Sequence, residues 1–262
     1  MSALLAVRAD GFVAPDVSNF WQPIFGDGPW AITRACILFT LSGVVIAWWL
    51  LAVTRKLTVV PGRLQYFTES VYGLVRNSLA RDLIGSRDFL RFVPLLFTLF
   101  VLILLNNFFG VVPPFLFPTM SRIGFPVALM LVVFVTYHYL GIRKHGVGGY
   151  FKGMLPSGVT GPLVLFIYPL ELLTYFFTRP VTLALRLFGN MFAGHLLLLL
   201  FITGGEFLVV ESQGFLMKIA GAFSYLMAFV MTMFEILVQF LQAYIFTLLS
   251  ALYIAGALAD EH

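Results

Sequence analysis

The sequence predicts an all-α polytopic membrane protein. We expect about five membrane-embedded helices and one interfacial amphipathic helix, with the last two helices long, steeply tilted and paired as a hairpin. Of the 262 residues, 60% are hydrophobic and only 11% are charged, and the mean hydropathy is +0.97. Soluble domains carry roughly 25% charged residues. Residues 31–262 are therefore interpreted as a single membrane domain, preceded by a tail of residues 1–30.

The tail carries Trp21 and Trp30, which are placed like interfacial anchors. The first span, residues 31–53, is long enough to cross a bilayer core of about 30 Å. It ends at two cations, Arg55 and Lys56.

Residues 63–89 have a mixed pattern, in which apolar residues recur at helical spacing among charged ones. Such a pattern predicts an amphipathic helix on the membrane surface. The apolar series is Leu64, Phe67, Val71, Leu74, Val75 and Leu79.

Two further spans follow, at residues 92–112 and 123–142. The first is closed by Pro113-Pro114 and the second by the cationic run 143–145, after which a glycine-rich loop is expected. Two longer apolar segments, 163–203 and 215–257, complete the domain. Pro169 and Pro180 are expected to kink the first of these without ending it, since membrane helices tolerate proline.

The last segment is longer than a bilayer requires. Residues 220–256 contain no proline, and a helix of that length measures about 55 Å. Either the helix is steeply tilted or one end projects into the cytoplasm. The segment stays apolar to Ala259, which favours tilt.

The distribution of cations predicts the orientation. Most arginines and lysines fall in loops that alternate to one side, so the positive-inside rule places the N-terminus outside and the C-terminus inside. Glu206 and Glu211 are then expected on the outer hairpin turn. The inner cations are Arg55, Lys56, Arg63, Arg76, Arg81, Arg87, Arg91, Arg143, Lys144 and Lys152.

Arg186 is the most informative residue, because it lies in the middle of an apolar segment. A guanidinium cannot lose its proton in a protein, and placing it in hydrocarbon costs about 2.5–3.5 kcal/mol on insertion scales. It therefore needs a carboxylate, a water-filled cavity or both. Asn190 shares its helix face, and so does Arg179, which we expect to snorkel to the headgroups.

The last segment carries a polar stripe, with Glu235, Gln239 and Gln242 at helical spacing. A carboxylate in hydrocarbon either pairs or takes up a proton, so Glu235 suits a proton relay, with His195 as partner. His195 points away from the Arg186 face. Packing alternatives remain open for all four residues: an ion pair between Arg186 and Glu235, a structural histidine, and glutamines that join helices. Other polar residues are more simply interhelical hydrogen-bond partners: Asn106, Asn107, Tyr137 and His138.

Several function classes find no support. One cysteine, Cys36, excludes an intrachain disulfide, and neither CxxC spacing nor a phosphate-binding loop occurs. We expect no cofactor, no metal and no nucleic-acid partner. A secondary transporter would show internal symmetry, and an intramembrane hydrolase would need a nucleophile or metal triad.

With these residues in view, the chain after residue 31 resembles subunit a of the F-type ATP synthase, the stator beside the rotating c-ring. The matching stretches are RPVTLALRLFGNMFAGH, EILVQFLQAYIFTLLSALYIAGALADEH and NNFFGVVP, in which Asn107 and Pro113 fit the family spacing.

The resemblance implies two offset proton half-channels that couple proton flow to rotation and ATP synthesis, with no covalent chemistry in this chain. Arg186 would face the c-ring carboxylates. Asn190 and Gln242 would match polar positions close to Arg186, and Glu235 and His195 would be the relay of the uptake half-channel. Gln239, on the same stripe as Glu235, is a further candidate for proton translocation. Glu171 is the candidate for the release path, but its spacing to Pro180 is one residue longer than the family pattern.

The implied partners are the c-ring, the subunit b stalk, the lipid bilayer and protons. We expect a bacterial plasma membrane, with a mitochondrial inner membrane as the alternative. Sodium coupling stays open, although the His195–Glu235 pair favours protons.

Overall fold

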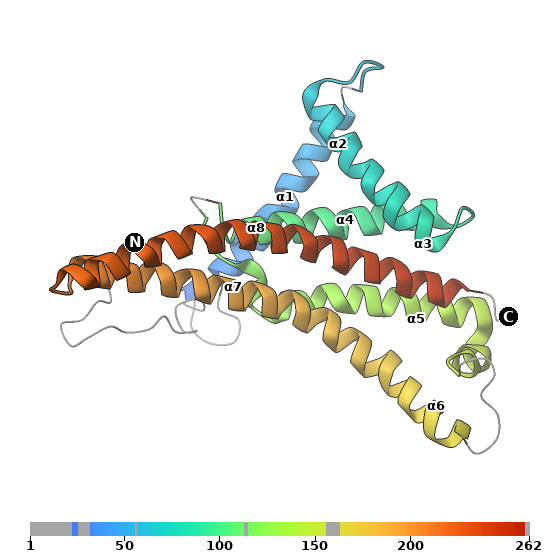
Figure 1. The fold of residues 1–262 in the computed structure, drawn as a ribbon. Coiled ribbons are helices and arrows are strands. Elements are labelled where there is room, and N and C mark those ends of the chain that lie inside the picture. Colours follow the sequence, from blue (N-terminus) through green and yellow to red (C-terminus); the bar gives the residue numbers. More distant parts are fainter. Residues whose placement is uncertain (1–22, 26–31, 56, 113–114, 156–162, 260–262) are drawn as a thin grey trace. The chain divides into compact units, whose positions relative to one another are not determined.

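The computed structural model describes residues 23–25, 32–55, 57–112, 115–155 and 163–259. It confirms an all-α polytopic membrane protein, since five helical stretches in the described part are long and apolar enough to cross a membrane (Figure 1). Outside the described residues lie Trp21, Trp30, Lys56, Pro113-Pro114, the end of the glycine-rich loop and residues 260–262.

One short strand pair departs from the expected all-helical pattern. Strand β1 (Pro23–Phe25) pairs antiparallel with β2 (Ile32–Thr33), directly before the first membrane helix. Arg122 donates a hydrogen bond to the Thr33 hydroxyl at 2.7 Å. The end of the tail is thus joined to the segment between the second and third spans.

The chain divides into two compact units. The first contains residues up to 43, 104–122 and 188–242, and the second contains 44–103, 123–187 and residues from 243 onward. Four helices contribute to both units: α1 (Arg34–Thr54), α4 (Phe89–Phe108), α7 (Arg179–Val210) and α8 (Phe215–Leu258).

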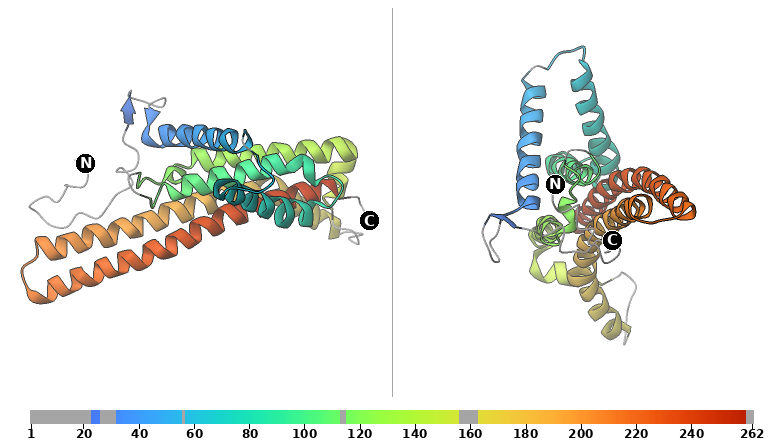
Figure 2. Two further views of the ribbon diagram at one scale, coloured as in Figure 1. Left: turned by 90° about the horizontal axis from the view of Figure 1, so that it is seen from above. Right: turned by 90° about the vertical axis from the view of Figure 1, so that its left-hand side faces the viewer.

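The first unit is built around the antiparallel hairpin of α7 and α8, whose arms lie side by side in both views (Figures 1 and 2). Small residues allow the two backbones to approach closely. A Cβ on Gly221 would lie 2.6 Å from Val209 Cγ2 and 3.1 Å from the Gly205 carbonyl oxygen. Ser224 also donates a hydrogen bond to the Phe201 carbonyl at 2.8 Å.

The hairpin turn lies further along the chain than expected, because this close packing extends α7. Helix α7 continues to Val210 instead of ending near residue 203, so Glu206 lies within the helix and only Glu211 lies in the turn. Gly205, a residue type that weakens an isolated helix, packs against α8 here, since a Cβ on it would lie 3.4 Å from the Gly221 carbonyl oxygen.

The two asparagines of α4 join helices of the first unit, as their sequence context predicts. Asn106 donates to the Ser42 hydroxyl of α1 at 2.7 Å. Asn107 donates to the main-chain carbonyl of Gln239 on α8 at 3.2 Å.

In the second unit, the amphipathic segment comprises α2 (Arg63–Gly73), a π-helical stretch (Leu74–Arg81) and α3 (Asp82–Ile84). Val75 and Leu79 are completely buried, whereas Leu64 and Phe67 are more than half exposed. The segment ends before residue 89 because Gly85 adopts a φ of 92°, which breaks the helix.

Helix α5 (Gly124–Gly153) runs past the expected end at residue 142 and takes up part of the expected glycine-rich loop. Gly146, at a φ of 72°, separates a final helical turn that folds back on the helix. Tyr150 of this turn is buried against Gly141, where a Cβ would lie 2.2 Å from the tyrosine ring. The sequence did not predict this turn, because the contact of Tyr150 with Gly141 that anchors it depends on how the chain packs.

The expected kinked helix is continuous, as predicted for membrane helices that contain proline. Helix α6 (Val164–Leu173) contains Pro169 and leads through a π-helical turn, Thr174–Thr178, into α7, whose second residue is Pro180. The chain therefore stays helical through both prolines, and the local change is a wider turn.

Candidate functional site

Glu235 lies in the first unit, on the face of α8 that packs against α7. It is only 5% exposed, and its Oε1 accepts a hydrogen bond from Gln239 Nε2 at 3.3 Å. The carboxyl group lies over Gly194, where a Cβ would be 3.5 Å from Glu235 Cδ. A Cβ there would make an ordinary van der Waals contact, so the carboxyl lies directly against α7 at this glycine.

His195 is the next residue along α7 and is also 5% exposed. Both titratable residues of the predicted relay therefore lie in the first unit, and both are buried. Glu235 lies over Gly194, the residue before His195 on α7.

Amide side chains lie around Glu235 on the neighbouring helices. Asn190 on α7 donates from Nδ2 to Gln242 Oε1 on α8 at 2.8 Å. Gln239 and Gln242 are 2% and 3% exposed. Together with the Asn107 bond to Gln239, these contacts connect α4, α7 and α8 through side-chain amides.

A small cavity lies between these residues, with a volume of about 10 Å³ for a water-sized sphere. Four buried polar atoms of its lining have no hydrogen-bond partner among the described residues: Asn107 Oδ1, Glu235 Oε2, Gln239 Oε1 and Gln242 Nε2. The volume is about that needed for one water. Asn107 could not be assigned to this cavity from the sequence, because the other lining residues come from α7 and α8, more than eighty residues further along the chain.

In the second unit, Arg186 is exposed at its position on α7. Among the described residues it has neither a hydrogen-bond partner nor a salt bridge. A permanent cation thus lies exposed on an apolar helix of this unit, a position that calls for a counter-charge or water.

Arg179, which we expect to snorkel to the headgroups, lies against two aromatic rings. Its guanidinium carbon lies 3.5 Å from the centre of the Tyr175 ring and 5.3 Å from that of Tyr253. These cation–π contacts stabilise the charge within the protein. Glu171 is half-buried on α6, on the other side of the π-helical turn.

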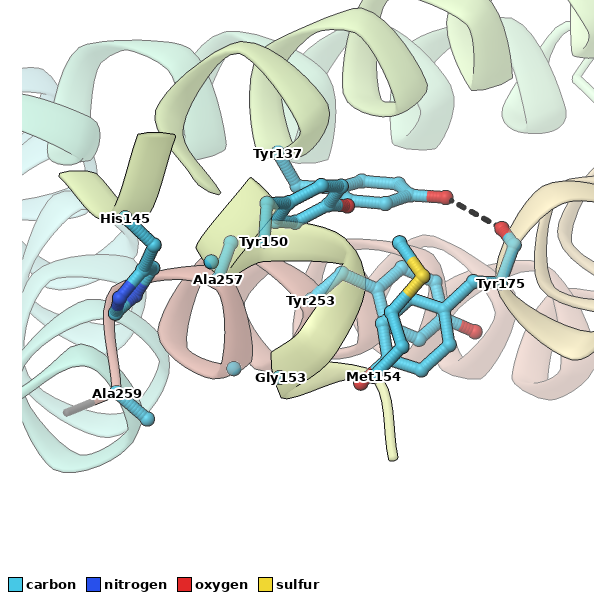
Figure 3. A pocket seen from close by; sticks show the side chains of 11 residues that line it. Tyr137, His145, Tyr150, Gly153, Met154, Tyr175, Tyr253, Ala257 and Ala259 are labelled. Carbon is cyan, nitrogen blue, oxygen red and sulfur yellow. Dashed lines mark hydrogen bonds between the residues drawn. The ribbon is translucent and has the colours of Figure 1, made fainter. Parts of the chain in front are cut away.

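A larger cavity of about 50 Å³ lies in the second unit, with room for a few waters. Figure 3 shows tyrosines gathered in its wall, with His145 at the opposite side. The tyrosines come from α5, the π-helical turn and α8: Tyr137, Tyr150, Tyr175 and Tyr253. Because these tyrosines come from three different elements, residue spacing along the chain does not predict this cavity.

Known proteins are similar to this chain over nearly its whole length. A family model described as the ATP synthase A chain matches residues 36–255. The chain is similar to ATP synthase subunit a of Nocardioides sp., with 45% identity over 100% of this chain and 98% of that protein. It is also similar to ATP synthase subunit a of Pseudarthrobacter chlorophenolicus, at 40% identity over 99% and 98% of the two chains. The same subunit of Streptomyces lividans is 37% identical over 96% and 90%.

Proposed function

Because the chain belongs to the ATP synthase subunit a family, we propose that it forms two offset proton half-channels beside a rotating c-ring. Proton flow through them turns the ring and so drives ATP synthesis in the attached catalytic head. The chain makes no covalent bond itself. The observation that carries this proposal is Arg186, an exposed cation on an apolar helix with no hydrogen bond or salt bridge among the described residues.

Arg186 acts on the carboxylate of each c subunit as it passes. Its charge favours the ionised carboxylate beside it, so a c subunit releases its proton before crossing the arginine. The same charge repels protons and prevents a direct leak between the two half-channels.

The uptake path runs through His195, Glu235 and the small cavity. One water in that cavity accounts for its four polar atoms when Glu235 carries a proton. The water then donates to the oxygens of Asn107 and Gln239 and accepts from Gln242 and the protonated carboxyl. When Glu235 is ionised, three acceptors compete for the two hydrogens of the water, so the cluster favours taking up the next proton.

The release path uses the second unit, where Glu171 precedes the two arginines of α7. The tyrosine-lined cavity in the same unit suits the few waters that such a path needs. Its lining includes the end of α5 and the end of α8, two segments that the positive-inside rule assigns to the cytoplasmic side.

The partners in this proposal are the c-ring, subunit b, the bilayer and the transported protons. We place the complex in a bacterial plasma membrane, with the N-terminus outside. A sodium-coupled complex is the second candidate, but the buried His195–Glu235 pair favours protons because both residues exchange them.

The proposal is tested by ATP-driven acidification of inverted membrane vesicles that carry Arg186→Ala, with ATP hydrolysis measured in parallel. We expect pumping to fall by at least about tenfold, because the c-ring carboxylate loses its counter-charge. The complex should still assemble, since Arg186 makes no hydrogen bond or salt bridge within the described chain.

Arg143→Ala is the matched control. Arg143 is exposed, and its hydrogen bond to the Tyr139 hydroxyl is long, at 3.5 Å. Its loss should leave pumping near the wild-type rate. Normal pumping by Arg186→Ala in an assembled complex would contradict the proposal, because the charge would then have no role at the rotor.

A further inference from the structure

The π-helical turn between α6 and α7 changes the angle around the helix axis between a residue before the turn and a residue after it. The N–H of Arg179 bonds to the carbonyl of Thr174, five residues earlier, whereas an α-helix bonds four residues back. A π-helical turn thus contains one more residue than an α-helical turn. Most π-helical turns are single insertions of this kind within α-helices, and they are frequent at functional sites.

Pro180 explains why the turn is wide. In an α-helix, the proline ring would clash with the carbonyl four residues before it, that of Phe176. A wider turn relieves this clash. Proline also has no N–H, and the N–H of Arg179 is already bonded to Thr174. The carbonyl of Tyr175 therefore receives no hydrogen bond from its own helix.

Tyr137 of α5 supplies the missing donor. Its hydroxyl donates to the Tyr175 carbonyl at 3.0 Å, and this bond is drawn in Figure 3. The Tyr175 ring in turn lies against the Arg179 guanidinium. Contacts on both sides of the backbone thus stabilise the wide turn, and all of these residues belong to the second unit.

The turn determines which face Glu171 occupies. Through a plain α-helix, Glu171 would lie about 80° around the axis from Arg179. Because the π-helical turn absorbs one residue, the difference falls to about 20°. Arg186, seven residues beyond Arg179, lies a further 20° or so away. Glu171, Arg179 and Arg186 therefore share one face.

We propose that the π-helical turn, held by Tyr137, places Glu171 on the arginine face, and that Tyr137 is a positioning residue of the release path. This inference rests on the proposed function. In that function the arginine face meets the rotor, so a carboxylate on the same face can take part in proton release. The spacing from Glu171 to Pro180 is one residue longer than the family pattern. The π-helical turn absorbs that residue and so keeps Glu171 on the same face as Arg179 and Arg186.

Two length variants test the inference in the whole ATP synthase. Deletion of Phe177, an exposed residue of the turn, should convert the turn to an α-helix that is kinked where the Pro180 ring meets the carbonyl four residues before it. Glu171 should then stay on the arginine face. Pumping per assembled complex should then stay within about twofold of wild type. Insertion of one alanine after Leu173 turns Glu171 by about 100°. Such misplacement should lower pumping by at least about tenfold.

Tyr137→Phe tests the same inference without changing the chain length. We expect it to lower pumping several-fold, because the Tyr175 carbonyl loses its donor and the turn loses its fixed shape. Deleting Phe177 in the Tyr137→Phe chain should restore pumping, since the α-helix then fixes the face of Glu171. A tyrosine that only stabilised the fold would not be rescued by the deletion.

The outcomes separate this inference from the proposed function. If Arg186→Ala abolishes pumping but the Phe177 deletion is as damaging as the alanine insertion, the positioning role of the turn is wrong and the stator function stands. If Tyr137→Phe pumps normally, or is not rescued, the role of Tyr137 is wrong. If Arg186→Ala pumps normally, the proposed function itself fails.

Discussion

Glu235 and Arg186 are two charged residues on apolar helices, and the structure treats them differently. Glu235 is buried and hydrogen-bonded within the first unit. Arg186 is exposed in the second unit and makes no hydrogen bond or salt bridge among the described residues. A carboxyl group can become neutral and so tolerate burial, but a guanidinium cannot. This difference in chemistry matches a division between a proton carrier and a fixed charge.

Glu235→Gln should slow proton uptake by at least about tenfold, because an amide holds the hydrogen bonds but cannot release a proton. The measurement is passive proton conduction through complexes from which the catalytic head has been removed. Glutamine has nearly the shape of glutamate, so the space over Gly194 is still filled and the fold should be kept.

The exchanged pair, His195→Glu with Glu235→His, provides the stricter test. If the two residues pass a proton between them, the double exchange should recover part of the conduction lost in each single exchange, since a carboxyl and an imidazole still face the same path. A double exchange that conducts no better than the worse single exchange would show that the residues act separately.

At the scale of elements, the hairpin of α7 and α8 depends on small residues at its outer end. The pairing of Gly205 with Gly221 lets the backbones touch, and it extends α7 beyond the apolar segment that the sequence marks out. Helix packing in a membrane has little hydrophobic drive, so close contact of this kind contributes much of the stability.

Gly221→Ala should therefore destabilise the hairpin. Its Cβ would lie 2.6 Å from Val209 Cγ2, and overpacking of this kind typically costs about 1–3 kcal/mol. We expect a lower thermal dissociation temperature of the membrane sector. Gly43→Ala on α1 is the control, because its Cβ would meet no atom within 4 Å; an equal loss in both variants would rule out the packing explanation.

At the scale of the whole molecule, the cations are distributed unevenly along the chain. With five spans in the described residues, we expect the two ends on opposite sides of the membrane. The positive-inside rule predicts the loop after α5 inside and the hairpin turn after α7 outside.

Single-cysteine labelling tests this orientation. In a chain with Cys36→Ala, we expect Gly148→Cys to react with a membrane-impermeant thiol reagent only from the cytoplasmic side, and Gln213→Cys only from the outside. Both positions are exposed. Labelling of the two cysteines from the same side, or each from the opposite side to that expected, would overturn the orientation.

The sequence by itself determined the class of protein, the number of apolar helices and the residues whose charge is out of place. These properties are local: span length, helical periodicity and the cost of burying a charge can be read from neighbouring residues. Arg186, Glu235, His195 and the amides of Asn190 and Gln242 were therefore found before the fold was known.

Only the tertiary structure decided how these residues are held. The cavity beside Glu235 needs Asn107 from α4, the end of α5 needs Tyr150 against Gly141, and the π-helical turn needs Tyr137. Each of these contacts joins residues from different turns or helices. Residue spacing specifies which side chains share a face of one helix, but a partner on another helix is chosen by packing, which spacing alone does not encode.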